Sequence, residues 1–127
     1  NRLIAWKSAL GAFSEHPVLG WGFENFRYAF DARYEPTLLR SGFSETYWDK
    51  PHNIFLEMLV TSGVLGLGLF LAVIIMAFYI VLRLSPRDFR PYGLGLLLAY
   101  LIQGMVTFDT FGSYLMLFIV FAFLHNY

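Results

Sequence analysis

The hydrophobic and polar positions divide this chain into a polar, aromatic-rich first part and an apolar second part. Between Ile54 and Leu82 the only charged side chain is that of Glu57. A helix needs about 20 apolar residues to cross the hydrocarbon of a bilayer, so this run is long enough for one crossing. Two further apolar runs follow it. The pattern therefore predicts an all-α polytopic membrane segment, with transmembrane helices at about 59–82, 92–108 and 112–127 and a loop at 83–91.

The first part, residues 1–58, is expected to lie outside the membrane and to contain short amphipathic helices. Apolar side chains at spacings of three and four predict a helix over residues 2–13. Its predicted apolar stripe is Leu3, Trp6, Leu10 and Phe13, and its predicted outer face is Lys7, Ser8 and Gly11. A second helix is expected within residues 25–34, with Phe26, Ala29 and Phe30 inward and Arg27 and Asp31 outward. Residues 35–50 show little periodicity and are expected to form a loop.

The segment between these two helices reads as a turn. It holds Gly20 and Gly22, which permit close approaches of the backbone that other residues resist. No strand precedes these glycines and no third glycine follows at the required spacing, so they do not form a dinucleotide-binding motif.

The start of the long apolar helix carries polar groups. Asp49 is its expected N-cap and Pro51 suits a first-turn position, which would place His52 and Asn53 at the helix N-terminus. Farther along, small residues allow close helix packing inside membranes. Such packing is expected at Gly63, Gly66 and Gly68.

The composition agrees with a membrane location. Hydrophobic residues make up 57% of the chain and charged residues 14%, whereas an average soluble domain has about 25% charged residues. The formal net charge is zero, which argues against a nucleic-acid partner. Cysteine is absent, which excludes disulfides and thiolate metal sites. The chain has neither an initiator methionine nor a signal peptide and stops within an apolar run, so we expect a piece of a larger membrane protein.

Three arginines in the short loop at residues 83–91 predict the orientation. Arg83, Arg87 and Arg90 identify the cytoplasmic side under the positive-inside rule. Residues 1–58 are then expected on the opposite, periplasmic or extracellular, side.

Three interpretations compete for the histidines and basic residues of the outer segment. Metal binding is the weakest, because His16 and His52 are distant in sequence and no cluster of carboxylates accompanies them. In a purely structural interpretation, His52 caps a helix and the arginines form a solvated face. In the third, the segment binds a lipid-linked phosphate or pyrophosphate, since arginine and helix N-termini suit phosphate groups and a neutral histidine can accept a proton from a hydroxyl.

Three ordered motifs resemble the O-antigen ligase and polymerase superfamily. They begin with Arg2-x3-Trp6-x2-Ala9-Leu10 and continue with His16-Pro17-Val18-Leu19-Gly20-Trp21-Gly22-x2-Asn25-Phe26. The third motif is His52-Asn53-x-Phe55-Leu56-Glu57-x2-Val60-x2-Gly63-x2-Gly66-Leu67. Together they span most of the chain and are fairly specific, although each alone would be weak.

The resemblance implies a function and a set of site residues. Members transfer a glycan from a polyprenyl-pyrophosphate donor to lipid A-core, to a growing polysaccharide or to a protein hydroxyl, by inverting transfer without a metal or soluble cofactor. It makes Arg2 a candidate for binding the donor pyrophosphate and His52 a candidate for engaging the acceptor hydroxyl. The candidate substrate-binding residues are Arg2, Trp6, Asn53 and Glu57. Of these, Asn53 and Glu57 are also expected to orient His52 or cap the helix. None of the three motifs assigns a position to Arg27, Arg33 or Arg40.

The resemblance further implies the bacterial inner membrane as location, with the other transmembrane helices of a longer protein and membrane lipids as partners. It does not separate ligase, polymerase and protein O-glycosyltransferase. A different class of function stays open beside it. The chain could be a non-catalytic membrane module, such as part of a transporter or an assembly scaffold, whose basic loop binds anionic lipid.

Overall fold

The computed structural model describes residues 2–41 and 47–125, and every regular element within them is helical. The α-helices are α1 (Arg2–Phe13), α2 (Phe26–Ala32), α3 (Ile54–Tyr79), α4 (Arg90–Gly104) and α5 (Phe111–His125). A 3₁₀ helix, η1 (Pro36–Ser41), follows α2, and a π-helical turn, η3 (Ile80–Leu84), extends α3. The expected all-α class is therefore confirmed for the described part of the chain.

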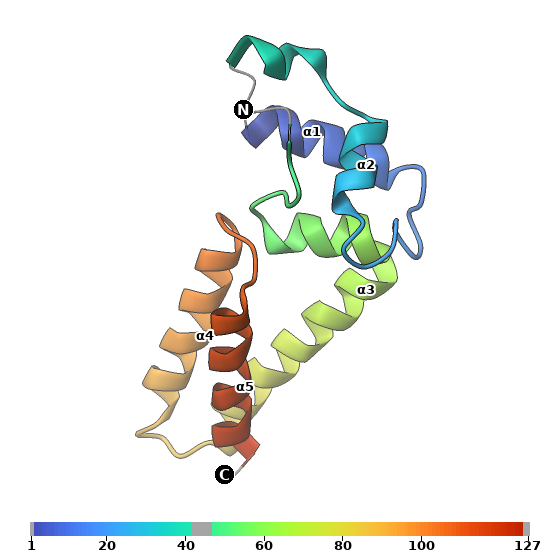
Figure 1. Cartoon of the computed structure of the whole chain (residues 1–127). Helices are drawn as coiled ribbons and strands as arrows, with labels where there is room; N and C mark the ends of the chain where they lie inside the picture. Colours follow the sequence, from blue (N-terminus) through green and yellow to red (C-terminus); the bar gives the residue numbers. More distant parts are fainter. Residues whose placement is uncertain (1, 42–46, 126–127) are drawn as a thin grey trace.

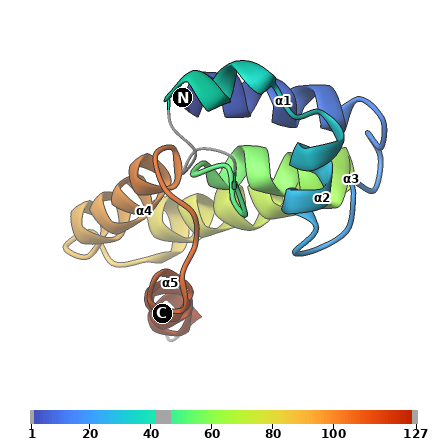
Figure 2. The same cartoon turned by 45° about the horizontal axis from the view of Figure 1, so that its top comes forward.

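The elements form two groups along α3. Figures 1 and 2 both show α1 running over the first part of α3, with α2 beside it. The other group is α4 and α5, which pack on each other near the second part of α3 (Figure 1). The loop between α4 and α5 points back toward the first group, whereas the loop between η3 and α4 lies at the far end (Figure 1).

The core of the first group lies beneath α1, but α1 does not bury its predicted stripe. Leu3 and Leu10 are 76% and 51% exposed, whereas Ser8 is buried. The residues that face the core are Ala5, Ala9 and Ala12, which pack with Phe26, Ala29, Phe30, Leu38, Trp48, Leu56 and Val60. Leu3 and Leu10 of the predicted stripe lie outside this core, because α1 packs on its neighbours through a face of small side chains. Trp6 and Phe13 flank this face and are partly buried.

The next segments agree better with the pattern. Helix α2 buries Phe26, Ala29 and Phe30, and Arg27 and Asp31 form an exposed ion pair of 3.6 Å, as predicted. Part of the expected loop at residues 35–50 is instead the 3₁₀ helix η1, which a fully buried Leu38 fixes to the core. The rest of that expectation falls partly on residues 42–46, outside the described residues.

Helix α3 is broken at Gly63. The backbone of Gly63 has φ 67° and ψ −168°, which are not helical. The turn at residues 17–22 enters the break, and its backbone replaces the lost helical hydrogen bonds. The amides of Val64 and Leu65 donate to the carbonyls of Pro17 and Val18 (2.9 and 3.4 Å), and those of Trp21 and Gly22 donate to Val60 and Thr61 (2.9 and 2.8 Å). These four hydrogen bonds give backbone groups at the break a partner within the chain.

The glycines of this region have different roles. A Cβ on Gly63 would lie 2.2 Å from the carbonyl oxygen of Val18, and one on Gly20 would lie 2.4 Å from the backbone of Thr61. Gly66 approaches only Ser62 of its own helix, and Gly68 has nothing within 4 Å. Among these three glycines, another segment of the described residues approaches closely only at Gly63, and that segment is a turn and not a helix. The expected helix packing at Gly66 and Gly68 stays a prediction.

One helix of the described residues is long and apolar enough to cross a membrane, namely Ile54–Leu84. A shorter apolar helix, Phe111–Ala122, lies within α5. Large apolar side chains such as Leu69, Ile75 and Met116 are exposed on these helices. Length and composition therefore show one of the three expected spans, and α4 ends at Gly104, earlier than the predicted residue 108.

Candidate active site at the start of helix α3

The site begins with His52, which lies just before α3 and not in its first turn. The expected N-cap, Asp49, is wrong. Asn53 caps the helix instead, because its side-chain oxygen accepts a hydrogen bond from the amide of Leu56 at 3.0 Å. His52 has φ 54°, a left-handed conformation that few residues other than glycine adopt.

Three contacts hold the His52 ring. Nδ1 lies 3.1 Å from the backbone oxygen of Lys50. The ring centroid also lies 5.5 Å from that of Trp48 and 5.1 Å from that of Phe108, both edge to face. A carbonyl oxygen can only accept a hydrogen bond, so Nδ1 carries the hydrogen in this contact. In the neutral ring, Nε2 is then the atom with a free lone pair.

The loop between α4 and α5 brings the other motif residues to His52. Nη1 of Arg2 donates to the carbonyl of Val106 at 3.3 Å, and Nδ2 of Asn53 donates to the carbonyl of Met105 at 3.3 Å. Phe108 of the same loop packs on His52. Arg2 is exposed, and its guanidinium has five N–H donors, so most of its donors can still bind a ligand.

Trp6 connects α1 to the same place. Its indole Nε1 donates to the carbonyl of Pro51 at 2.7 Å. Pro51 directly precedes His52, and Trp6 lies about one helical turn after Arg2. Trp6 therefore links the helix that carries Arg2 to the segment that carries His52.

Glu57 belongs to a cluster of charges beside the site. Lys50 Nζ lies 3.3 Å from Glu57 Oε1 and 3.6 Å from Glu24 Oε1. Partial burial opposes the charge of Lys50, but the two carboxylates outweigh it and raise the pKa of the ammonium group. Glu57 therefore has a protein cation as its partner.

The remaining histidine and arginines lie elsewhere. His16 packs edge to face on Trp21 at 4.8 Å, within the turn that enters the break of α3. Arg33 pairs with Glu15, and Arg27 lies over the ring of Tyr47 at 4.7 Å. Arg40 is exposed on η1. Among the residues that the structure describes, no three His, Asp or Glu side chains lie close enough together to hold a metal ion.

Sequence reasoning missed the part of the site that α4 and α5 provide. The carbonyls of Met105 and Val106 have no side-chain signature, and Phe108 looked like the end of an apolar run. The available signal was topological. The predicted spans at about 59–82 and 92–108 together return the chain to its starting side, so the pattern predicts Asp109 on the same side as His52.

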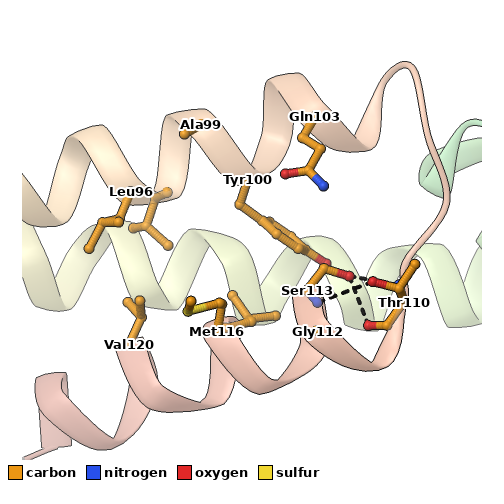
Figure 3. A pocket seen from close by; sticks show the side chains of 11 residues that line it. Leu96, Ala99, Tyr100, Gln103, Thr110, Gly112, Ser113, Met116 and Val120 are labelled. Atoms are coloured by element: carbon orange, nitrogen blue, oxygen red, sulfur yellow. Dashed lines mark hydrogen bonds between the residues drawn. The ribbon is translucent and has the colours of Figure 1, made fainter.

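A pocket of about 520 Å³ lies between α4 and α5 below this loop. Figure 3 shows Tyr100, Thr110 and Ser113 together at one end, and Leu96 and Val120 at the other. Asp109 organises the polar end, since it accepts hydrogen bonds from the hydroxyls of Tyr100 (2.8 Å) and Ser113 (2.9 Å). The carboxylate thereby fixes the loop that contacts Arg2, His52 and Asn53.

Comparison with known proteins gives a consistent picture. The family model described as O-antigen ligase matches residues 1–71. A protein of Rickettsia typhi named "Putative polysaccharide ligase" is 26% identical over 109 residues, which cover 86% of this chain and 27% of that protein. A protein of Rickettsia conorii with the same kind of name is 24% identical over 119 residues, which cover 86% of this chain and 26% of that protein. The chain thus spans about a quarter of the length of these relatives. No solved structure matches the chain.

Proposed function

The chain belongs to the O-antigen ligase family, and from this premise we propose that it forms part of a membrane glycosyltransferase. The proposed enzyme moves a glycan from a polyprenyl-pyrophosphate donor to an acceptor hydroxyl. The acceptor is lipid A-core, a growing polysaccharide or a protein. Because the relatives are about three times as long, the proposed active protein includes helices outside this chain.

One observation carries the proposal. Arg2 and Asn53 both hydrogen-bond to the loop at residues 105–106, and the neighbouring Phe108 packs on His52. The guanidinium of Arg2, which suits a pyrophosphate, and the imidazole of His52, which suits proton transfer, thus contact the same loop. Such convergence of an arginine and a positioned histidine is what glycosyl transfer from a pyrophosphate needs.

In the proposed reaction, the acceptor oxygen attacks the anomeric carbon of the donor sugar from the side opposite the pyrophosphate. A carbon–oxygen bond to the acceptor forms as the bond to the donor phosphate breaks, so the configuration inverts. The acceptor proton moves to Nε2 of His52, and polyprenyl pyrophosphate leaves with the bonding electrons. Arg2 stabilises the charge that develops on the leaving pyrophosphate, which assigns that role to an arginine and not to a metal ion.

Asn53 and Glu57 have supporting roles in this proposal. Asn53 joins the start of α3 to the loop at Met105 and caps the helix at the same time. Glu57 holds Lys50 beside the histidine. Trp6 sets the position of α1 relative to His52 through Pro51.

The proposed topology follows from the two ends of α3. We place the site on the periplasmic side of a bacterial inner membrane, with residues 1–58 outside the bilayer and spans at about 59–82, 92–108 and 112–127. The loop that carries Arg83, Arg87 and Arg90 lies at the opposite end of α3 from the site (Figure 1). A single crossing by α3 between these ends agrees with cytoplasmic arginines.

The test uses substitutions in the full-length protein. Isolated membranes supply the native acceptor, and released polyprenyl pyrophosphate measures turnover whichever acceptor is used. His52→Ala should lower turnover about 10²-fold or more, as expected for loss of a general base. Arg2→Ala should lower it about 10²-fold through loss of charge stabilisation.

Two matched controls separate these effects from damage to the fold. His16→Asn removes the other histidine of the outer segment, and Arg33→Ala removes an arginine paired with Glu15. Both should keep turnover within about threefold of wild type, because each lies away from the loop at residues 105–108. Normal turnover in His52→Ala and Arg2→Ala at wild-type abundance would sink the proposal and favour a non-catalytic membrane module.

A further inference from the structure

Lys50 connects three separate segments through its side chain. Its ammonium group pairs with Glu57 in the first turn of α3 and with Glu24 in the turn before α2. The side chains of Lys50 and Glu57 are only 23% and 15% exposed. Charge pairs that are partly withdrawn from water hold their geometry better than exposed pairs. Lys50 is therefore fixed in place by the elements around it.

The same residue contacts the surroundings of His52 from two sides. The backbone oxygen of Lys50 accepts from Nδ1 of His52 at 3.1 Å, which sets the tautomer of the ring. The ammonium group lies 5.6 Å from the centroid of Phe108, and Phe108 packs on the other side of His52 at 5.1 Å. Movement of Lys50 would change both the hydrogen bond and the aromatic contact that hold the imidazole.

The charge of Lys50 is not arranged to bind the donor phosphates. Two carboxylates already face its single positive charge, so the balance of this cluster is negative and repels an anion. Arg2, in contrast, is exposed and donates to a neutral carbonyl. The two basic residues therefore have different roles.

We propose that Lys50 is a positioning residue that holds His52 in the orientation required for proton transfer. This proposal rests on the proposed function, because it assumes that His52 engages the acceptor hydroxyl. Lys50 touches no reacting atom in it. The residue acts through its carbonyl, through Phe108 and through the ion pair with Glu57.

The experiment measures kcat and the KM for the polyprenyl-pyrophosphate-linked glycan, in membranes containing the full-length protein. Lys50→Gln should lower kcat about 10- to 100-fold, because a small misplacement of a catalytic group costs that much. The KM for the donor should stay within about twofold, since Arg2 is untouched. Lys50→Arg keeps the charge and should recover at least about half of kcat. Lys7→Gln, an equivalent change on the exposed face of α1, should leave both constants unchanged.

A double-mutant cycle with Glu57→Gln guards against loss of the fold. If Lys50 and Glu57 act as one clamp, Lys50→Gln/Glu57→Gln should lose no more kcat than either single variant, and the double variant leaves no unpaired carboxylate at residue 57. Additive losses would overturn the proposal, as would a normal kcat in Lys50→Gln or a raised KM with unchanged kcat. His52→Ala tells the two proposals apart. If it abolishes turnover while Lys50→Gln is normal, only the role of Lys50 is refuted, whereas normal turnover in His52→Ala refutes the proposed function itself.

Discussion

His52 combines an unusual backbone with a closely held side chain. Its left-handed φ of 54° costs of order 1–3 kcal/mol and persists only where the surroundings enforce it, although histidine adopts this region more often than most residues. The surroundings that enforce it are the capped start of α3 and the rings of Trp48 and Phe108. Strain of this kind recurs at functional sites. At the scale of the residue, the fold thus stabilises a specific orientation of one imidazole.

Gly63 allows a residue-scale test of the break in α3. Gly63→Ala should destabilise the protein by on the order of 3 kcal/mol, because the added Cβ meets the Val18 carbonyl and φ is 67°. Gly68→Ala is the matched control, since nothing lies within 4 Å and the backbone there is helical. The control should be neutral or more stable by about 1 kcal/mol. Thermal unfolding of the full-length protein in detergent measures both, and equal midpoints for the two variants would contradict the break.

At the scale of elements, the turn at residues 17–22 and α3 depend on each other. The turn supplies hydrogen-bond partners for the broken helix, and the break accommodates the turn. This exchange positions α1 over the first part of α3 and so places Trp6 beside Pro51. The His-Pro-x-x-Gly motif therefore has a structural role in holding the turn in the break of α3.

Two tryptophans test this division of roles. Trp6→Phe removes the hydrogen bond to Pro51, and Trp21→Phe removes an equivalent one of 2.8 Å to Ala12. Each loss should lower stability by about 1 kcal/mol. Only Trp6→Phe should also lower turnover, by about fivefold, because it loosens the segment that carries His52. Unfolding midpoints and released polyprenyl pyrophosphate separate the two effects, and equal turnover in both variants would argue against the assignment.

At the scale of the whole molecule, the candidate site and the loop of three arginines occupy opposite ends. The site gathers where α1, the start of α3 and the loop after α4 meet, and the arginine loop lies beyond η3 (Figure 1). Exposed apolar side chains cover the helices between these ends. A bilayer around that apolar surface would place the proposed lipid-linked donor near the end of the molecule that carries Arg2.

Single cysteines test this orientation, and the absence of cysteine from the chain makes them specific within it. Thr37→Cys should react with a membrane-impermeant maleimide in spheroplasts. Arg87→Cys should react only after the membrane is permeabilised, because it lies in the proposed cytoplasmic loop. Labelling is measured as a mass shift of the full-length protein, and any cysteines outside this chain are first replaced. The reverse pattern would invert the topology and remove the proposed periplasmic site.

The hydrophobic pattern alone determined much of this protein. It predicted the helical class, the long apolar helix after residue 53 and the burial of Phe26 and Phe30, because these depend on local spacing and on the length of apolar runs. The motifs indicated the family and selected Arg2 and His52, whose roles stay predictions. These properties require no knowledge of which segments touch.

The tertiary structure decided the features that depend on contacts between distant segments. It turned the alanine face of α1 inward, moved the helix cap from Asp49 to Asn53 and broke α3 at Gly63. It also brought the carbonyls of Met105 and Val106 to Asn53 and Arg2. No local pattern encodes these outcomes. A glycine in an apolar run is predicted to be helical, and only the backbone of a distant segment can replace its helical hydrogen bonds. Every residue has a backbone carbonyl, so the sequence does not show which carbonyls accept a hydrogen bond from a distant side chain.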